Sequence, residues 1–221
     1  MSGRVLIVNP NANGAVTAAM AEAVAPLVVT GGPALDCVTL EEGPFGIESQ
    51  ADVEAVTLPL ARLVRAREDA DAFVIACFSD PGLAVCREAT ARPVLGIQEC
   101  AVMTALTVGD RYGVVALSEA SIRRQDRYAR QMGVAERRAG ARPLGLSVAA
   151  AEAAAARPRI EAVARRLVEE DGADVVILGC AGMARHRAPL ARALGRPVID
   201  PVQAAAVQAM GLVLLARGSA A

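Results

Sequence analysis

The fold of this 221-residue chain is decided by two similar stretches of sequence, Asp71-Ala72-Phe73-Val74-Ile75-Ala76-Cys77 and Asp174-Val175-Val176-Ile177-Leu178-Gly179-Cys180. Each is a short apolar run that ends in cysteine, a pattern typical of a buried parallel strand. The second cysteine follows the first by 103 residues, the difference between positions 180 and 77. The repetition predicts two similar α/β halves, each with its cysteine at the carboxyl end of a strand.

Two further matches work outward from this pair. Residues 93–98 match residues 197–202, and the opening strand at 5–8 has a counterpart at 113–117. Three matches in the same order favour two pseudosymmetric Rossmann-like lobes with mainly parallel sheets; one continuous sheet with coincidental repetition is the alternative. We expect an N-terminal lobe of residues 1–98 plus 203–221 that carries Cys77. The C-terminal lobe, residues 99–202, carries Cys180.

Between the repeats, β-branched runs alternate with longer stretches rich in Ala, Leu, Arg and Glu, as in βα units. The Asp80-Pro81 pair predicts a helix start, with Asp as N-cap and Pro in the first turn. The expected strands are at 4–8, 35–40, 72–77, 93–97, 112–117, 143–147, 174–179 and 197–200. The expected helices are at 14–28, 50–67, 81–90, 99–106, 119–132, 149–170, 184–194 and 202–216.

Composition excludes several classes of function. The chain is 54% apolar, and its formal charge of −1 gives no field that attracts nucleic acid or an anionic membrane. All 23 basic residues are arginine, which excludes a Schiff-base lysine and a P-loop. The single histidine, His186, excludes a multi-histidine metal site and argues against a Ser-His-Asp triad. We therefore expect neither a metal nor a cofactor.

The apolar runs and the cysteines predict compartment and partners. The first apolar run is too short for a signal peptide, and no run reaches the roughly 18 residues of a membrane span. Five cysteines at irregular spacing favour reduced thiols in the cytoplasm over a disulfide framework. We expect a small-molecule substrate, no nucleic acid and no membrane partner. A core with 2% aromatic residues makes a homo-oligomer the expected assembly.

The two strand-terminal thiols carry the predicted chemistry. Ligands of open α/β sheets bind beyond the carboxyl ends of the strands, so Cys77 and Cys180 would approach one cleft from opposite lobes. The residues that follow each cysteine open helices, whose N–H groups can lower a thiol pKa towards neutrality. One sulfur could then act as a thiolate base and the other as a thiol acid. This pair could invert a carbon next to a carbonyl without metal or pyridoxal phosphate.

Other residues are weaker candidates. The segment 9–14 follows a strand and could bind a planar imide or a carboxylate, although a plain strand-to-helix turn explains it equally well. Ser118 follows the strand at 113–117 as Asn9 follows the strand at 5–8, which makes Ser118 a candidate binding residue of the second lobe. Cys37, Cys86 and Cys100 are expected in the core. His186 and the arginine pairs at 123–124, 137–138 and 165–166 are expected on solvated surfaces.

Several motifs together resemble the hydantoin/allantoin racemase branch of the Asp/Glu racemase superfamily. They are Asn9-Pro10-Asn11, Gly43-Pro44-x-x-Ile47-Glu48-Ser49, Ala76-Cys77-Phe78-Ser79-Asp80-Pro81-Gly82-Leu83, Gly179-Cys180-Ala181-Gly182-Met183 and Pro197-Val198-Ile199-Asp200. The resemblance covers nearly the whole chain and implies an oligomer with a cofactor-independent, two-base mechanism at Cys77 and Cys180. It implies that the carbonyl groups of the substrate bind to Asn11 and to the amides after each cysteine, at Phe78, Ser79, Ala181 and Gly182. The side-chain pocket would lie at Pro44, Phe45 and Ile47.

Departures from the pattern concern the substrate. Ser79 stands where this branch commonly has Gly, and Ala12-Asn13 where it commonly has Thr-Ser. Phe78 and Ala181 replace the Thr or Asn of amino-acid racemases, which favours a 5-substituted hydantoin or allantoin over free aspartate or glutamate. An amino-acid racemase, an arylmalonate-type decarboxylase, which needs only the second cysteine, and a maleate-type isomerase remain alternatives. A non-catalytic small-molecule binder is the alternative outside enzymes.

Overall fold

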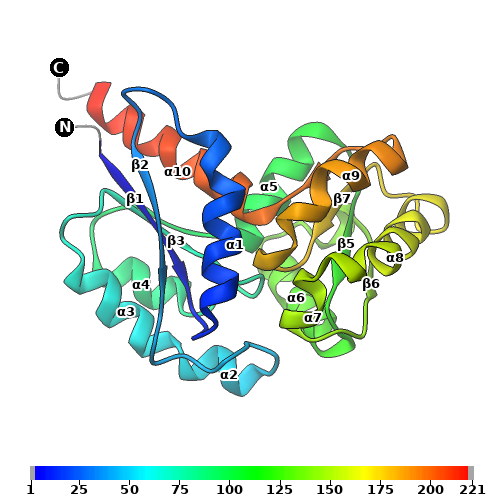
Figure 1. The fold of residues 1–221 in the computed structure, drawn as a ribbon, viewed down its shortest axis with the longest axis horizontal. Helices are drawn as coiled ribbons and strands as arrows, with labels where there is room; N and C mark the ends of the chain where they lie inside the picture. The colour runs from blue at the N-terminus through cyan, green and yellow to red at the C-terminus, as the bar shows by residue number, and fades with distance from the viewer. Residues whose placement is uncertain (1–2, 219–221) are drawn as a thin grey trace.

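Each half of the chain forms its own four-stranded parallel sheet in the computed structural model, which describes residues 3–218 (Figure 1). The first sheet has the order β2-β1-β3-β4 and the second the order β6-β5-β7-β8, so the two share one topology. This confirms the expected pair of pseudosymmetric α/β lobes. The expected N-terminal lobe also includes residues 1–2 and 219–221, which lie outside the described part of the chain.

The first lobe follows the chain from β1 to β4. Its elements are β1 (Arg4–Asn9), α1 (Gly14–Val24), β2 (Ala34–Thr39), α2 (Gln50–Ala55), α3 (Thr57–Ala66), β3 (Ala72–Ile75), α4 (Leu83–Ala89) and β4 (Val94–Gly96). The strand β3 and all of β1 after Arg4 are buried because apolar helices cover both faces of the sheet. The single helix expected over 50–67 is instead two helices, which meet at Val56.

The second lobe repeats this order after α5. Its elements are α5 (Ile97–Val108), β5 (Tyr112–Ala116), α6 (Glu119–Gln131), β6 (Arg138–Pro143), α7 (Val148–Glu152), α8 (Arg157–Glu169), β7 (Val175–Leu178), α9 (Ala184–Leu194) and β8 (Val198–Ile199). The last helix, α10 (Pro201–Gly218), returns to pack against α5, β1 and β3 (Figure 1). Among the described residues, no helix combines the length and apolar character of a membrane span.

Two expectations in the second lobe are wrong. The strand expected at 143–147 lies at Arg138–Pro143, an edge strand whose residues are all half-buried and which therefore lacks a continuous apolar run. The helix expected over 149–170 is broken at Ala153, which has an extended backbone. The main helix begins only at Arg157, with Pro158 in its first turn.

A third expectation, that Asp80 caps the helix that follows it, is also wrong. The helix α4 begins at Leu83, after Gly82 in the left-handed region (φ 64°). The carboxylate of Asp80 instead caps α5, where it accepts the N–H groups of Gln98 and Glu99 at 2.9 and 2.8 Å. Gly96 permits this contact, because a Cβ atom there would lie 2.2 Å from the Asp80 carboxyl carbon.

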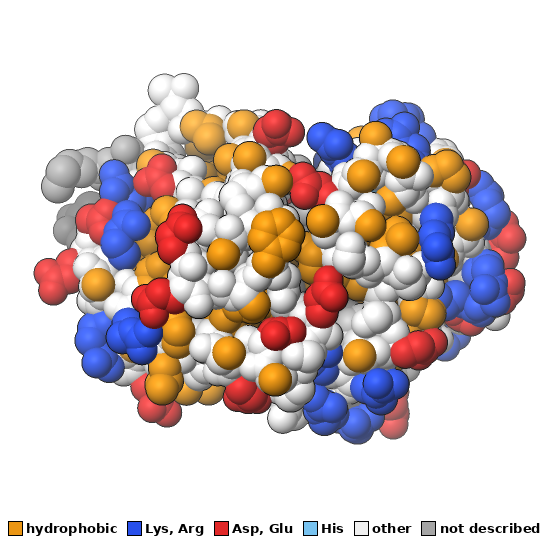
Figure 2. All heavy atoms as spheres, turned by 60° about the horizontal axis from the view of Figure 1, so that its bottom comes forward, with side chains coloured by type: hydrophobic (Ala, Val, Ile, Leu, Met, Phe, Trp, Pro, Cys, Tyr) orange, Lys and Arg blue, Asp and Glu red, His pale blue; other side chains and the backbone are white. Residues whose placement is uncertain are grey.

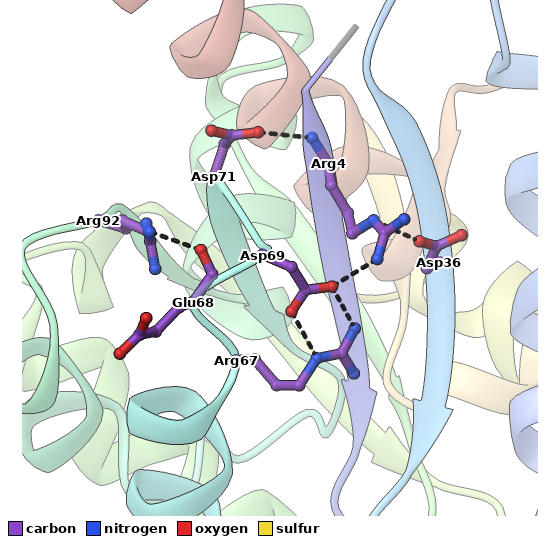
Figure 3. A network of polar contacts seen from close by, with 7 residues as sticks. All are labelled: Arg4, Asp36, Arg67, Glu68, Asp69, Asp71 and Arg92. Atoms are coloured by element: carbon purple, nitrogen blue, oxygen red, sulfur yellow. Dashed lines mark hydrogen bonds and ion pairs between the residues drawn. The ribbon is translucent and has the colours of Figure 1, made fainter. Parts of the chain in front are cut away.

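A charged cluster joins the amino ends of three strands in the first lobe (Figure 3). Arg4, at the start of β1, forms ion pairs with Asp36 and Asp69, and its N–H donates to Asp71. Arg67 donates to both carboxylate oxygens of Asp69. The cluster is exposed, so its contribution to stability is small. The functional candidates lie at the opposite, carboxyl end of these strands.

Candidate active site

A cavity lies between the two lobes at the carboxyl ends of their strands. The space of about 30 Å³ within it holds roughly two water molecules. Figure 2 shows hydrophobic side chains gathered in the middle of one face, with acidic and basic side chains around them. The residues that line the cavity are Asn11, Val16, Ile47, Ala76, Cys77, Phe78, Ser79, Leu117, Ser121, Arg124, Val148, Gly179, Cys180 and Ala181.

Cys77 reaches the cavity from the loop after β3. The backbone of this loop turns back sharply, and the N–H of Asp80 donates to the Cys77 carbonyl at 3.0 Å. Asp80 itself has φ 43°, in the left-handed region that Asp tolerates better than most residues. Burial raises the pKa of the Cys77 thiol to about 12. The neighbouring Cys180 and Asp80 raise this pKa further, while Arg124 and the Ser79 N–H lower it.

Cys180 reaches the same cavity from the loop after β7, at the start of the short turn Ala181–Met183. Gly179 lets this loop lie against β5, because a Cβ atom there would be 2.6 Å from the Val115 carbonyl oxygen. Burial raises the pKa of the Cys180 thiol to about 11. The backbone N–H groups of Gly182 and Ala181 donate towards the sulfur and oppose this rise.

These pKa values contradict the expectation that helix N–H groups bring a thiol towards neutrality. The N–H groups act in the expected direction at both sulfurs, but burial outweighs them. The effect of Cys180 on Cys77 is that of like charges, so the first thiolate to form disfavours the second. The arrangement therefore favours at most one thiolate and one thiol in the cavity.

The loop after β1 contributes a buried amide. The Oδ1 atom of Asn11 accepts from Asn9 Nδ2 and from the Asn13 N–H at 3.1 and 3.0 Å. Its Nδ2 group has no acceptor among the described residues and lines the cavity. Asn13 caps α1 by accepting the Ala15 N–H. The segment is therefore both an ordered strand-to-helix turn and a wall that can donate one hydrogen bond.

The loop after β2 supplies one of its three candidates to the cavity. Ile47 is buried and lines the wall. Pro44 supports the neighbouring loop, since its carbonyl accepts the Ala12 N–H at 2.9 Å, but its side chain is not on the wall. Phe45 is 69% exposed and is not among the residues that line the cavity, so its role in a side-chain pocket stays a prediction.

Of the residues that follow the two cysteines, Phe78 and Ser79 of the first lobe and Ala181 of the second line the cavity. Gly182 and Ser118, both in the second lobe, do not. Ser118 caps α6 by accepting the Ser121 N–H, and Gly182 acts only through its N–H towards Cys180. The expected surface position of His186 is wrong, because the ring is buried and one ring nitrogen lies 3.2 Å from the Ala151 carbonyl.

Seven residues of the wall were not predicted from the sequence: Val16, Ala76, Leu117, Ser121, Arg124, Val148 and Gly179. Arg124 matters most for chemistry, and its expected place on a solvated helix face is wrong. A signal was present in the helical period, because Ser121 and Arg124 fall three and six residues after the Ser118 cap and so lie on one face of α6.

This two-lobed α/β architecture, with two thiols on one interlobe cavity, defines the class of protein to which the chain belongs. A model of the Asp/Glu/Hydantoin racemase family matches residues 5–209, and the chain belongs to that family. It is therefore an isomerase of the racemase type. A hydantoin racemase from Paenarthrobacter aurescens is 36% identical over 96% of this chain and 92% of its own length.

Solved structures agree with this membership. An allantoin racemase from Klebsiella pneumoniae has a TM-score of 0.92 and 30% identity, covering 97% of this chain and 89% of that chain. Arylmalonate decarboxylase has a TM-score of 0.67 at 18% identity, covering 95% of this chain and 92% of that chain, which shows the fold alone. The fold by itself therefore does not distinguish these activities.

Proposed function

We propose that the chain racemises a hydantoin-like cyclic amide, a 5-substituted hydantoin or allantoin, by proton transfer between Cys77 and Cys180. The single observation that carries this proposal is that thiols from opposite lobes line one cavity. The names of the similar proteins, hydantoin racemase and allantoin racemase, support the substrate class.

The chemistry balances without an added reagent. The thiolate of one cysteine removes the proton from the stereocentre and becomes a thiol, and the carbon–hydrogen electron pair moves into an enolate. The thiol of the other cysteine then donates its proton to the opposite face of the carbon and becomes a thiolate. The Asn11 amide and the N–H groups around the cavity stabilise the developing negative charge on the carbonyl oxygen.

The charges on the cavity wall disfavour a substrate that carries an ammonium group. Among the described residues, the cavity wall contains no carboxylate that could hold the ammonium group of a free amino acid. Val16, Ile47, Phe78, Leu117 and Val148 provide apolar surface for a ring and its substituent. A cyclic amide, which presents carbonyls and N–H groups without a full charge, therefore fits this wall better than aspartate or glutamate does.

The test is incubation with enantiopure 5-substituted hydantoins and with enantiopure allantoin. We expect optical rotation to decay to zero while NMR shows the ring intact. Loss of the ring or release of carbon dioxide would indicate another reaction, and stable rotation with tight binding would indicate a non-catalytic binder. Either result would contradict the proposal.

We also propose the assembly and the boundaries that the sequence predicts. The packing of α10 against β1 and β3 supports the assignment of residues 203–218 to the first lobe. Exposed apolar residues on the adjoining helices α5 and α10, Met103, Val108, Val207, Leu212 and Leu214, support a homo-oligomer, which sedimentation would test. The five free thiols support a reducing compartment, the cytoplasm.

A further inference from the structure

Among residues 3–218, Arg124 is the one cationic residue on the cavity wall, and part of its guanidinium is unpaired. Its Nε atom is buried and has no acceptor among the residues that the structure describes. A buried N–H without a partner is costly unless something in the cavity accepts from it. An ordinary arginine on a solvated helix face would not have a buried Nε–H group without an acceptor.

The side chain of Arg124 crosses from one lobe to the other. It originates on α6 of the second lobe, and its Nη1 donates to the Glu48 carbonyl of the first lobe at 3.1 Å. Two neighbouring contacts also join the lobes: Arg127 donates to Gln50 at 2.6 Å, and the Val148 N–H donates to the Glu48 carboxylate at 3.3 Å. These contacts hold Arg124 between the two lobes.

The two thiols differ in what stabilises their charge. The groups that face Cys77 are Cys180 and Asp80, which disfavour its thiolate, and Arg124 and the Ser79 N–H, which favour it. Cys180 instead receives N–H groups from its own loop, at Ala181 and Gly182. The supporting charge of Cys77 thus comes from the opposite lobe, whereas the supporting dipoles of Cys180 come with its own strand.

We propose that Arg124 is a positioning residue that stabilises the thiolate of Cys77 across the cleft between the lobes. This inference rests on the proposed two-thiol racemase function. It accounts for the buried Nε atom of Arg124, which has no acceptor among the described residues.

The test measures the alkylation rates of Cys77 and Cys180 by iodoacetamide in the same sample, resolved by peptide mass spectrometry. Opening of the cleft changes access to both thiols, so their ratio reports the charge on Cys77. In Arg124→Gln, we expect the Cys77:Cys180 ratio to fall about tenfold at pH 8, which corresponds to a rise of about one unit in the Cys77 pKa. Arg124→Lys keeps the charge and should stay within about threefold of the wild-type ratio.

Two variants serve as matched controls. Arg127→Gln removes a contact between the lobes without removing the cation on the cavity wall, and Arg123→Gln removes an exposed charge from the same helix. Both should keep the wild-type ratio within about twofold. A wild-type ratio in Arg124→Gln, or an equal fall in Arg127→Gln, would overturn the proposal. The readout needs no substrate, so it stands even if the hydantoin assay fails.

Discussion

The two lobes share a topology but place a buried carboxylate differently behind their thiols. In the first lobe, Asp80 follows Cys77 by three residues and caps α5, and Gly96 ends the neighbouring strand β4. In the second lobe, Met183 follows Cys180 by three residues, and Asp200 stands in the position of Gly96. Asp200 caps α10 by accepting the Gln203 N–H at 2.9 Å.

The carboxylate thus stands after the cysteine in one lobe and after the last strand in the other, which shows what the repeat preserves. Each lobe keeps one carboxylate at the amino end of the helix after its last strand, where the N–H groups and the helix dipole favour it. The residue that supplies the carboxylate is not preserved. The thiols, in contrast, occupy equivalent positions in both lobes, which is the arrangement that proton transfer between two faces requires.

The largest expected effect comes from removing either thiol. Cys77→Ser and Cys180→Ser should each lower the racemisation rate by about 10³-fold or more, because a hydroxyl is a far weaker acid and base at this position. Cys37→Ser, on the edge strand β2 and outside the cavity, is the control and should retain activity. Polarimetry measures all three. If Cys77→Ser and Cys180→Ser both retained activity, the two thiols would not be equivalent proton-transfer groups and the comparison of the lobes would fail.

A smaller effect should follow from filling the space that Asp80 uses. Gly96→Ala places a Cβ atom against the Asp80 carboxyl, so we expect a loss of about 1–3 kcal/mol in the free energy of unfolding and lower activity. Gly211→Ala, in α10 with open space around it, is the matched control and should be neutral or stabilising. Urea denaturation measures both. A neutral Gly96→Ala would mean that Asp80 does not need its observed position.

Stability should also depend on pH through the two capping carboxylates. Burial raises the pKa of Asp80 and of Asp200 to about 7, above the value of about 3.9 in an unfolded chain. Their contribution is therefore fully present below about pH 4 and is lost as the pH rises through 7. We expect a lower urea midpoint at pH 8 than at pH 5, with a weaker dependence in Asp80→Asn and Asp200→Asn. An unchanged dependence in both variants would refute this assignment.

The smallest effect concerns the loop after β2. Ile47 lines the cavity opposite Val148 of the other lobe, whereas Phe45 is exposed. Ile47→Ala should raise KM about tenfold, or change the ratio of kcat/KM between the two hydantoins about tenfold. Phe45→Ala should change kcat/KM by less than about twofold. Steady-state polarimetry with two hydantoins of different substituent size would measure this. A larger effect of Phe45→Ala on kcat/KM would indicate that Phe45 contacts the substrate.

The sequence predicted well what depends on local apolar pattern. The buried runs that end at Cys77 and Cys180 predicted the strands, and their repetition predicted the two sheets. The edge strand Arg138–Pro143 was misplaced because its residues are half-buried and do not form a continuous apolar run. Leu144 and Leu146, which suggested a strand there, lie in the loop beyond it.

The errors around the cavity arose from long-range contacts. Asp80 and Pro81 form a plausible local helix start, but the carboxylate is captured by the N–H groups of a helix 17 residues further along the chain. Arg124 looks like any arginine on a charged helix until the other lobe is placed against it. His186 and Leu190, four residues apart and both buried, carried a helical signal that was overlooked.

The most direct test of the two-thiol account is the position of deuterium early in the reaction. One enantiomer of a 5-substituted hydantoin is incubated with the enzyme in deuterium oxide, and both enantiomers are separated and analysed at low conversion. Proton transfer between two thiols predicts deuterium at the stereocentre of the newly formed enantiomer and protium in the recovered substrate. Deuterium appearing at the same rate in both enantiomers, or protium retained in the product, would contradict it.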